Sequence, residues 1–330
     1  MATYKEIFGT NIEVLASDPA NPVTGQVWYN STDNVVKGAA ATTAGAWATG
    51  GNLNTARGFG SSAGTYTAGL YFGGTTVPGN TTYSAAAEAY NGVSWTEVND
   101  LNTARFAGGG VGATNTAALM YGGIDPSPAN TGATESYNGT WTEVNDLNTA
   151  RHGIASAGAS NTSALAIGGS GGDVQNENWN GTSWTEVGDL NTARHTAAGA
   201  GTATAAIVFG ASNVGPVPSA ITESWNGTSW TEVNDLNTAR GNLAGSGLQT
   251  SALAFGGNVP PRTTVTEEWN GSTWSEQNDL SLARYDLTAV QQGGTANNLA
   301  IGGNAAPGQT AQTEEWTGAG APLTVTFTDS

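Results

Sequence analysis

One stretch recurs along this chain and constrains its fold more than any other feature. The sequence WTEVNDLNTAR occurs at residues 95–105, 141–151 and 230–240, and with one change at 184–194. Weaker copies occupy residues 47–57 and 274–284, and the six closing arginines are 48, 46, 43, 46 and 44 residues apart. A period in the forties indicates an array of one repeated supersecondary unit.

The repeat between residues 194 and 240 predicts four strands. Residues 195–210 form two runs of Ala, Gly and β-branched residues, whose glycine density disfavours a helix. We expect a third strand at 221–225, a hairpin turn at Asn226-Gly227, and a fourth strand at 230–236. Neither face of the fourth strand is purely apolar, so we expect it to be a partly exposed outer strand. Trp225 and Trp230 flank the turn and are expected to pair across it.

Four strands in each of six units predict an all-β, six-bladed β-propeller with antiparallel blades. The array begins with a lone fourth strand at 46–53 and ends with a third strand at 313–316. We therefore expect the strand around Trp47 to complete the blade that contains Trp316; the alternative donor is the alternating segment 323–330. The expected domains are an N-terminal attachment segment at 1–43, with a short hairpin at 26–38, and a propeller at 44–330.

The repeat pattern resembles the kelch repeat. Its features are a di-glycine after an apolar strand, an aromatic residue followed five residues later by Trp, and a Leu-x-x-x-Arg connector. The resemblance extends from Trp47 to Trp316, and it implies a propeller fold. The spacing between the aromatic residue and Trp is shorter than in most kelch repeats, so the chain resembles a close relative of that family.

Composition excludes several classes of function. The net charge is −17 and only nine residues are Lys or Arg, which argues against nucleic-acid partners. No cysteine is present, so thiolate catalysis and cysteine metal sites are excluded. No apolar run approaches about 20 residues, and the N-terminus lacks a signal-peptide pattern, so we expect neither a membrane span nor secretion by that route.

The repeated charged and aromatic residues are expected to be structural. We expect each repeat arginine to bracket adjacent blades by binding a third-strand glutamate or a carbonyl, and each repeated Asp to accept backbone N–H bonds. We expect neither a metal ion nor a cofactor. The residues concerned are Arg57, Arg105, Arg151, Arg194, Arg240 and Arg284; Glu88, Glu135, Glu177, Glu223, Glu267 and Glu314; Asp100, Asp146, Asp189, Asp235 and Asp279; and Trp47, Trp95, Trp141, Trp184, Trp230 and Trp274.

Candidate binding residues are those that break the repetition. His152 and His195, the two histidines, directly follow a repeat arginine, and Phe106 and Tyr285 share that position. If this position lies at the channel mouth, paired imidazoles there would suit a proton or a metal, although two ligands alone are a weak metal site. Variable loops follow the second strands and are expected on one face, where binding usually occurs. Their candidate residues are Tyr83, Asp125, Asp173 and Arg262.

The N-terminal segment carries a second resemblance. Residues 22–32 have the pattern Pro-x-x-Gly-Gln-x-Trp-Tyr-Asn-Ser-Thr, which resembles segments of bacteriophage tail-associated and virion structural proteins. Propeller arrays after such a segment look like kelch-like phage proteins, although near-identical copies also fit recent repeat amplification or an engineered consensus. The resemblance implies a virion protein made in the host cytoplasm.

The function expected from these patterns is non-enzymatic. No catalytic motif is present, and a monomeric phage structural or adhesion protein would present its loops to a host-surface glycan or protein, or bind other virion proteins. Two alternatives stay open: a glycan-active hydrolase or oxidase at the channel mouth near His152 and His195, and a scaffold for protein–protein interaction.

Overall fold

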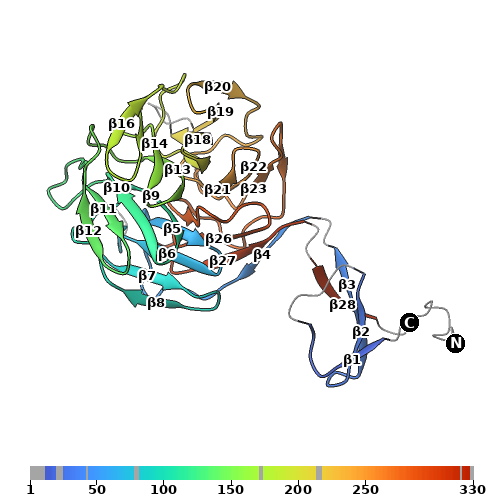
Figure 1. Ribbon diagram of the computed structural model, residues 1–330. Helices are drawn as coiled ribbons and strands as arrows, with labels where there is room; N and C mark the ends of the chain where they lie inside the picture. Colours follow the sequence, from blue (N-terminus) through green and yellow to red (C-terminus); the bar gives the residue numbers. More distant parts are fainter. Residues whose placement is uncertain are drawn as a thin grey trace. The chain divides into compact units, whose positions relative to one another are not determined.

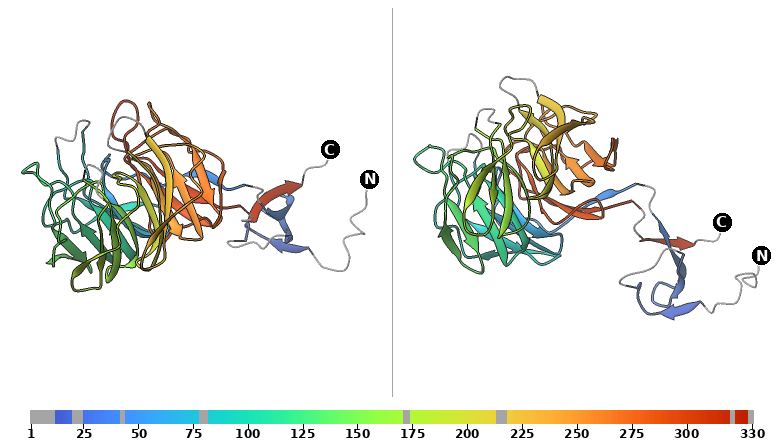
Figure 2. Two further views of the ribbon diagram at one scale, coloured as in Figure 1. Left: turned by 90° about the horizontal axis from the view of Figure 1, so that it is seen from above. Right: turned by 45° about the horizontal axis from the view of Figure 1, so that its top comes forward.

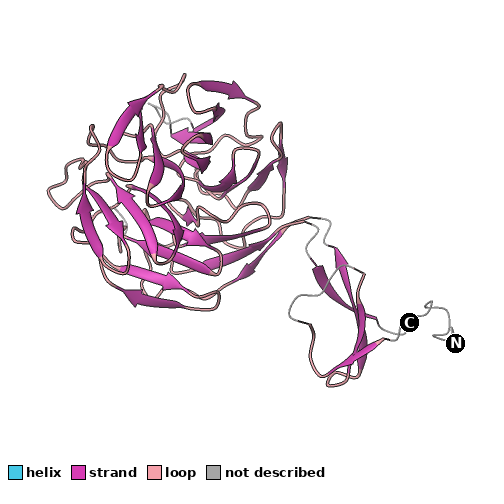
Figure 3. Cartoon of the chain, in the orientation of Figure 1, coloured by secondary structure: helices cyan, strands magenta, loops and turns pink. Residues whose placement is uncertain are grey.

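The computed structural model describes residues 12–19, 25–41, 44–77, 82–170, 174–212, 218–319 and 322–327. The regular secondary structure of these residues consists of β-strands alone (Figure 3). They contain no helix long and apolar enough to cross a membrane. The chain divides into a smaller unit, Met1–Gly45 with Gly318–Ser330, and a larger unit, Ala46–Thr317.

The smaller unit contains one four-stranded sheet in the order β1-β2-β3-β28. Its strands are β1 (Glu13–Leu15), β2 (Val27–Asn30), β3 (Val35–Ala41) and β28 (Pro322–Phe327). β1 is parallel to β2, and the other neighbours are antiparallel. The expected hairpin is β2–β3. The chain departs from expectation at its C-terminal strand, because β28 joins this sheet instead of the propeller domain.

The described residues of the larger unit form six four-stranded antiparallel sheets. Each is a meander of consecutive strands, except that β4 joins β25, β26 and β27. The strands are β5 (Ser61–Thr65), β6 (Ala68–Phe72), β7 (Ala87–Tyr90) and β8 (Trp95–Val98); β9 (Gly109–Thr114), β10 (Ala117–Tyr121), β11 (Thr134–Tyr137) and β12 (Trp141–Val144); β13 (Ala155–Ser160), β14 (Ser163–Ile167), β15 (Asn176–Trp179) and β16 (Trp184–Val187); β17 (Ala198–Thr202), β18 (Ala205–Ser212), β19 (Pro218–Trp225) and β20 (Trp230–Val233); β21 (Ala244–Leu248), β22 (Ser251–Phe255), β23 (Thr266–Trp269) and β24 (Trp274–Glu276); and β25 (Thr288–Ala289), β26 (Asn297–Ile301), β27 (Thr313–Thr317) and β4 (Ala46–Thr49).

The sheet arrangement is that of an all-β propeller. The first strands β5, β9, β13, β17, β21 and β25 contact one another in succession, and β25 also contacts β5. Figures 1 and 2 show the sheets of the larger unit radiating from these strands. The described residues thus form seven four-stranded sheets where the sequence predicted six. The prediction missed the sheet of the smaller unit because only two of its strands are adjacent in the sequence as a hairpin.

The N-terminal strand of the larger unit completes its last sheet. β4 pairs with β27, and Trp47 lies opposite Trp316 with ring centroids 5.2 Å apart and planes inclined by 53°. The indole Nε1–H of Trp47 also donates to Oγ1 of Thr266 in the preceding sheet, at 3.0 Å. The pairing of these strands is the one predicted from the repeat, and the alternative donor at 323–330 instead lies in β28 as far as it is described.

Side-chain size follows position within each sheet. First strands consist largely of Gly, Ala and Ser and are buried, whereas fourth strands such as β8 and β20 have a buried Trp followed by exposed residues. Trp47 in β4 is half-buried. Trp225 and Trp230 pack across their turn with centroids 5.2 Å apart, as expected. Small residues at the centre let strands from different sheets approach closely, and aromatic residues fill the wider space between sheets toward the outside.

Buried ion pairs join each connector to the sheet that follows it. In every repeat, Nη2 of the arginine lies beside Oε1 of the third-strand glutamate, as for Arg240 and Glu267 at 3.1 Å, and neither side chain is exposed by more than 3%. Nη1 of Arg240 also donates to the carbonyl of Val265 at 2.7 Å. The expected bracket is confirmed. The remaining pairs are Arg57–Glu88, Arg105–Glu135, Arg151–Glu177, Arg194–Glu223 and Arg284–Glu314.

The repeated aspartates bind backbone as expected at four positions. Oδ1 of Asp235, for example, accepts the N–H of Thr222 at 3.0 Å, so the carboxylate ties the segment after the fourth strand to the third strand. The same bond is made by Asp100, Asp146 and Asp279.

Candidate functional site

The second residue after each repeat arginine has a left-handed backbone conformation. The φ angles at these six positions lie between 51° and 63°. Glycine occurs at only one of them, although other residues adopt this region rarely and at an energetic cost. Such a repeated departure indicates that the fold requires the conformation there. The positions are Phe59, Ala107, Gly153, Thr196, Asn242 and Asp286.

These six residues are joined by a cyclic series of backbone hydrogen bonds, here called the central ring. Each N–H donates to the carbonyl of the equivalent residue one repeat earlier, and the N–H of Phe59 donates to the carbonyl of Asp286. The N···O distances are 2.7–2.9 Å, so all six bonds have good geometry. The ring connects all six sheets of the larger unit to one another.

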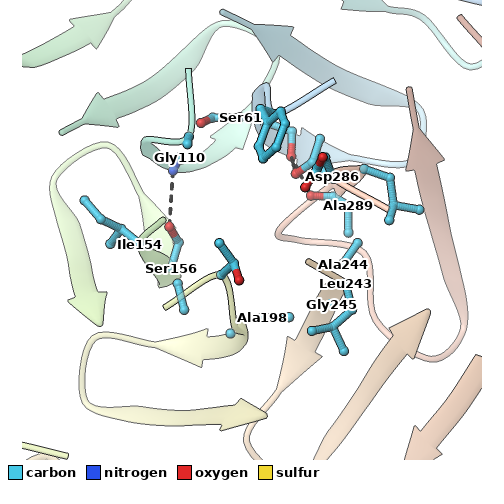
Figure 4. Close-up of a pocket in the computed structure, with 18 of the residues that line it drawn as sticks. Ser61, Gly110, Ile154, Ser156, Ala198, Leu243, Ala244, Gly245, Asp286 and Ala289 are labelled. Atoms are coloured by element: carbon cyan, nitrogen blue, oxygen red, sulfur yellow. Dashed lines mark hydrogen bonds between the residues drawn. The ribbon is translucent and has the colours of Figure 1, made fainter. Parts of the chain in front are cut away.

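A cavity of ≈ 120 Å³ lies among the ring residues and the first strands. Its wall is made mainly of small side chains and backbone, and a Cβ on Gly199 would lie 2.5 Å from the carbonyl oxygen of Ser156. Figure 4 shows the wall, where Oγ of Ser156 accepts the N–H of Gly110 at 3.2 Å. Glycine at such positions keeps the strands close and the cavity open.

Asp286 is the carboxyl group of this cavity. It is 6% exposed, and its Oδ1 accepts Nδ2–H of Asn242 at 2.6 Å. Its Oδ2 has no hydrogen-bond partner among the described residues, and the same holds for Oε1 of Gln291, which also lines the cavity. Burial raises the pKa of Asp286 well above its usual value, and the hydrogen bond from Asn242 opposes that shift.

At four of the six repeats, the residue directly after the arginine forms a β-bridge with the loop between the second and third strands. Phe106 forms an antiparallel bridge with Ile124, and Ile124 forms another with Asn130 in its loop. Equivalent pairs of bridges occur at Gly58, Gly241 and Tyr285. These contacts place the loops on the face of the larger unit that carries the central ring, here called the ring face. The sequence expectation that these loops share a face is confirmed for the loops bridged in this way.

Aromatic side chains from neighbouring sheets meet on the ring face. Tyr83 stacks on Phe106 with centroids 5.2 Å apart and planes inclined by 10°, and Phe59 meets Phe106 edge-on at 5.7 Å. Phe106 is buried, whereas Tyr83 and Phe59 are half-buried. The guanidinium of Arg262 lies 5.9 Å from the ring of Tyr285. The structure therefore brings four of the predicted candidates together as two aromatic contacts.

The two histidines are close enough to influence each other. Burial lowers the pKa of His152, and His195 lowers it further; burial also lowers the pKa of His195. Nδ1 of His152 lies 2.8 Å from Oδ1 of Asn130, and Nδ1 of His195 has no hydrogen-bond partner among the described residues. Lowered pKa values favour neutral imidazoles at pH 7. The described residues contain no group of three or more His, Cys, Asp or Glu that could hold a metal ion.

The remaining two candidate binding residues are Asp125, which the structure describes, and Asp173, which it does not. Asp125 accepts the backbone N–H of Ser127 at 2.9 Å and also its hydroxyl, and these bonds lower the pKa of the carboxylate. Asp125 therefore fixes its own loop and does not line the cavity. Asp173 lies outside the described residues.

Sequence reasoning missed Asp286, Gln291 and the central ring. The ring positions are two residues after each repeat arginine, so the repeat could have located them. Their side chains, however, share no chemistry, and the common property is a backbone angle that six different residue types adopt.

Comparison with known proteins supports the fold. No protein-family model matches the chain, and no curated protein does. Among solved structures, one described as the structure of YjhT is similar, with a TM-score of 0.65 and 12% sequence identity. The match covers 79% of this chain and 95% of that one. At this identity the similarity establishes a β-propeller fold, which is consistent with a binding scaffold.

Proposed function

We propose that the chain is a non-enzymatic binding protein whose larger unit is a closed six-bladed propeller that presents the ring face to a host-surface glycan. The closed ring is supported by the cyclic hydrogen bonds of the central ring and by the β4–β27 pair. A rigid scaffold that carries variable loops on one face is an arrangement in which binding residues are often found.

The observation that carries this proposal is the stack of Tyr83 on Phe106. Phe106 is held in the core, and it fixes one face of the Tyr83 ring while Tyr83 stays partly exposed. A preordered aromatic ring with a polar hydroxyl is well suited to contact the apolar face of a sugar ring. Arg262, held against Tyr285 on the same face, supplies hydrogen-bond donors for hydroxyl or carboxylate groups of a glycan.

A glycan array tests the proposal. Replacing Tyr83 or Arg262 with alanine should weaken binding by about tenfold or more, which is roughly 1.4 kcal/mol. Tyr66 provides the matched control because it is exposed in the β5–β6 turn, at the end of those strands away from the central ring. Loss of binding in Tyr66→Ala with full binding in Tyr83→Ala, or binding only to proteins, would contradict a glycan site on the ring face.

We further propose that the protein belongs to a phage virion, with the smaller unit as the attachment element that contacts other virion proteins. The support is the resemblance of residues 22–32 to segments of virion proteins. Electron microscopy of purified virions labelled with an antibody against the larger unit tests this. Absence of label from virions, with the protein present in infected cytoplasm, would exclude the assignment.

The histidine pair favours a second candidate, a hydrolase or oxidase that acts on glycans. Two neutral imidazoles on the ring face would supply a general base, and His195 has an unpaired Nδ1. Turnover of a substrate panel that is lost in both His152→Ala and His195→Ala would establish this activity. Binding without turnover would favour the first proposal.

A further inference from the structure

Two hydrogen-bond acceptors of residues that line the central cavity lack donors among the described residues. Oδ2 of Asp286 and Oε1 of Gln291 are both buried, both belong to cavity-lining residues, and neither has a partner among the described residues. Buried acceptors in folded proteins almost always have a partner, and an unpaired carboxyl oxygen is especially unfavourable. The other carboxyl oxygen of Asp286 is held by Asn242, so the side chain has a fixed orientation.

We propose that the cavity binds a small organic ammonium ion, whose N–H groups donate to the Asp286 carboxylate and the Gln291 amide oxygen. An ammonium group has only donors and carries the charge that a carboxylate requires, so it matches the two unpaired acceptors. The site lies among the residues of the central ring and includes neither Tyr83 nor Arg262, so the proposal does not depend on glycan binding.

The remainder of the cavity suits the alkyl part of such an ion. Ile154 and Leu243 contribute apolar wall, and the volume of ≈ 120 Å³ admits a ligand of only a few heavy atoms. A divalent metal ion is a poorer match because Asp286 is the one carboxylate among the residues that line the cavity. The net charge of −17 also favours the approach of cations.

Binding of the ion should be coupled to loss of a proton from Asp286. Burial raises the pKa of this carboxyl group well above its usual value, and an ammonium ion pairs with the ionised form, so binding of the ion favours release of the proton. Tyr71 and Tyr285 are the titratable groups that interact with Asp286; the pKa of Tyr71 is about 12 and that of Tyr285 is also raised. Both phenols therefore remain neutral, and we expect affinity for the ammonium ion to increase from pH 5 to pH 8.

Calorimetric titration of the full chain with ethylammonium chloride tests the site. We expect saturable binding at one site, weaker by about tenfold or more in Asp286→Asn. Asparagine keeps the shape of the side chain and tolerates the left-handed backbone, and circular dichroism checks that the variant is folded. Glu143→Gln, which removes an exposed carboxylate on β12, is the matched control and should bind as the wild type does.

Two further ligands separate an ammonium site from a general cation site. Tetramethylammonium has the charge but no N–H group, and potassium ion has neither donors nor an alkyl part, so both should bind at least about tenfold more weakly. Equal affinity for either ion, unchanged ethylammonium affinity in Asp286→Asn, or affinity that does not increase with pH would each overturn the proposal.

Discussion

Arg240 and Glu267 form an ion pair from which water is excluded, with 3.1 Å between Nη2 and Oε1 and neither side chain exposed. Burial lowers the pKa of Arg240 to about 10, which still leaves the guanidinium charged at pH 7. The glutamate also accepts the backbone N–H of Asn237 at 2.7 Å. The connector of one repeat is therefore held by the third strand of the next through both side-chain and backbone groups.

Arg240→Ala should destabilise the larger unit by about 3–5 kcal/mol, because the substitution leaves a buried carboxylate without its counter-charge. The measurement is the urea midpoint together with the melting temperature. Arg262→Ala is the control, since this arginine is outside the repeat and is only partly buried. An unchanged melting temperature for Arg240→Ala would show that the Arg240–Glu267 ion pair does not stabilise the larger unit.

Removal of β4 should destabilise the last sheet of the larger unit. A chain of residues 46–317 retains the β4–β27 pair and should melt cooperatively, whereas a chain of residues 54–317 loses the pair and exposes β27 as a free edge. We expect the shorter chain to melt at a lower temperature and to form oligomers, as measured by calorimetry and light scattering. Identical melting temperatures for the two chains would mean that the β4–β27 pair does not stabilise the larger unit.

Ala107→Gly should stabilise the protein by about 0.5–1 kcal/mol, because glycine removes the cost of a left-handed backbone at this position of the central ring. Ala46→Gly provides the opposite case: it lies in β4 without a positive φ and should destabilise by about 0.5–1 kcal/mol. Chemical denaturation of both variants measures the difference. If both substitutions destabilise equally, the ring positions store no strain.

The raised pKa of Asp286 makes stability depend on pH. In the absence of ligand, the folded state holds the proton more tightly than the unfolded chain does. The favourable contribution is therefore complete below the unfolded pKa, near 3.8, and is lost as the pH rises through the folded value. Asp286→Asn should stabilise the protein at pH 7–8 and have little effect near pH 3–4, as measured by urea midpoints at each pH.

Asp125→Asn should have the opposite sign, because hydrogen bonds from Ser127 lower the pKa of Asp125. Its carboxylate contributes stability above the unfolded pKa, and this contribution is lost as the pH falls through the folded value. A common pH profile for the two variants would contradict the assignment of the two carboxyl environments.

The features that could be predicted are those that every repeat shares. The arginine–glutamate pairs, the outer strand with its buried Trp, and the pairing of Trp47 with Trp316 each follow from residue types at fixed positions. β28 was assigned to the wrong unit because an alternating apolar pattern fits any available sheet edge, and the pairing partner is set by tertiary context.

The candidate site was harder to predict because its central feature is conformational. Asp286 shares its position with Phe59 and Gly153, and these residues have in common only a backbone angle and a hydrogen bond. The sequence placed Phe106, Tyr285 and the histidines at one position correctly, but it could not indicate that the cavity begins one residue later. Patterns in a single sequence reveal the periodicity of side chains. They do not reveal a backbone conformation that all six repeats share when the side chains at that position differ.

The pairing of β4 with β27 also determines how mechanical load passes through the chain. Ala46 lies opposite Thr317, and these two residues are the ends of the larger unit, so both connections to the smaller unit leave from one end of one strand pair. Tension applied through the smaller unit is therefore shared between two adjacent strands, which move together instead of being peeled apart.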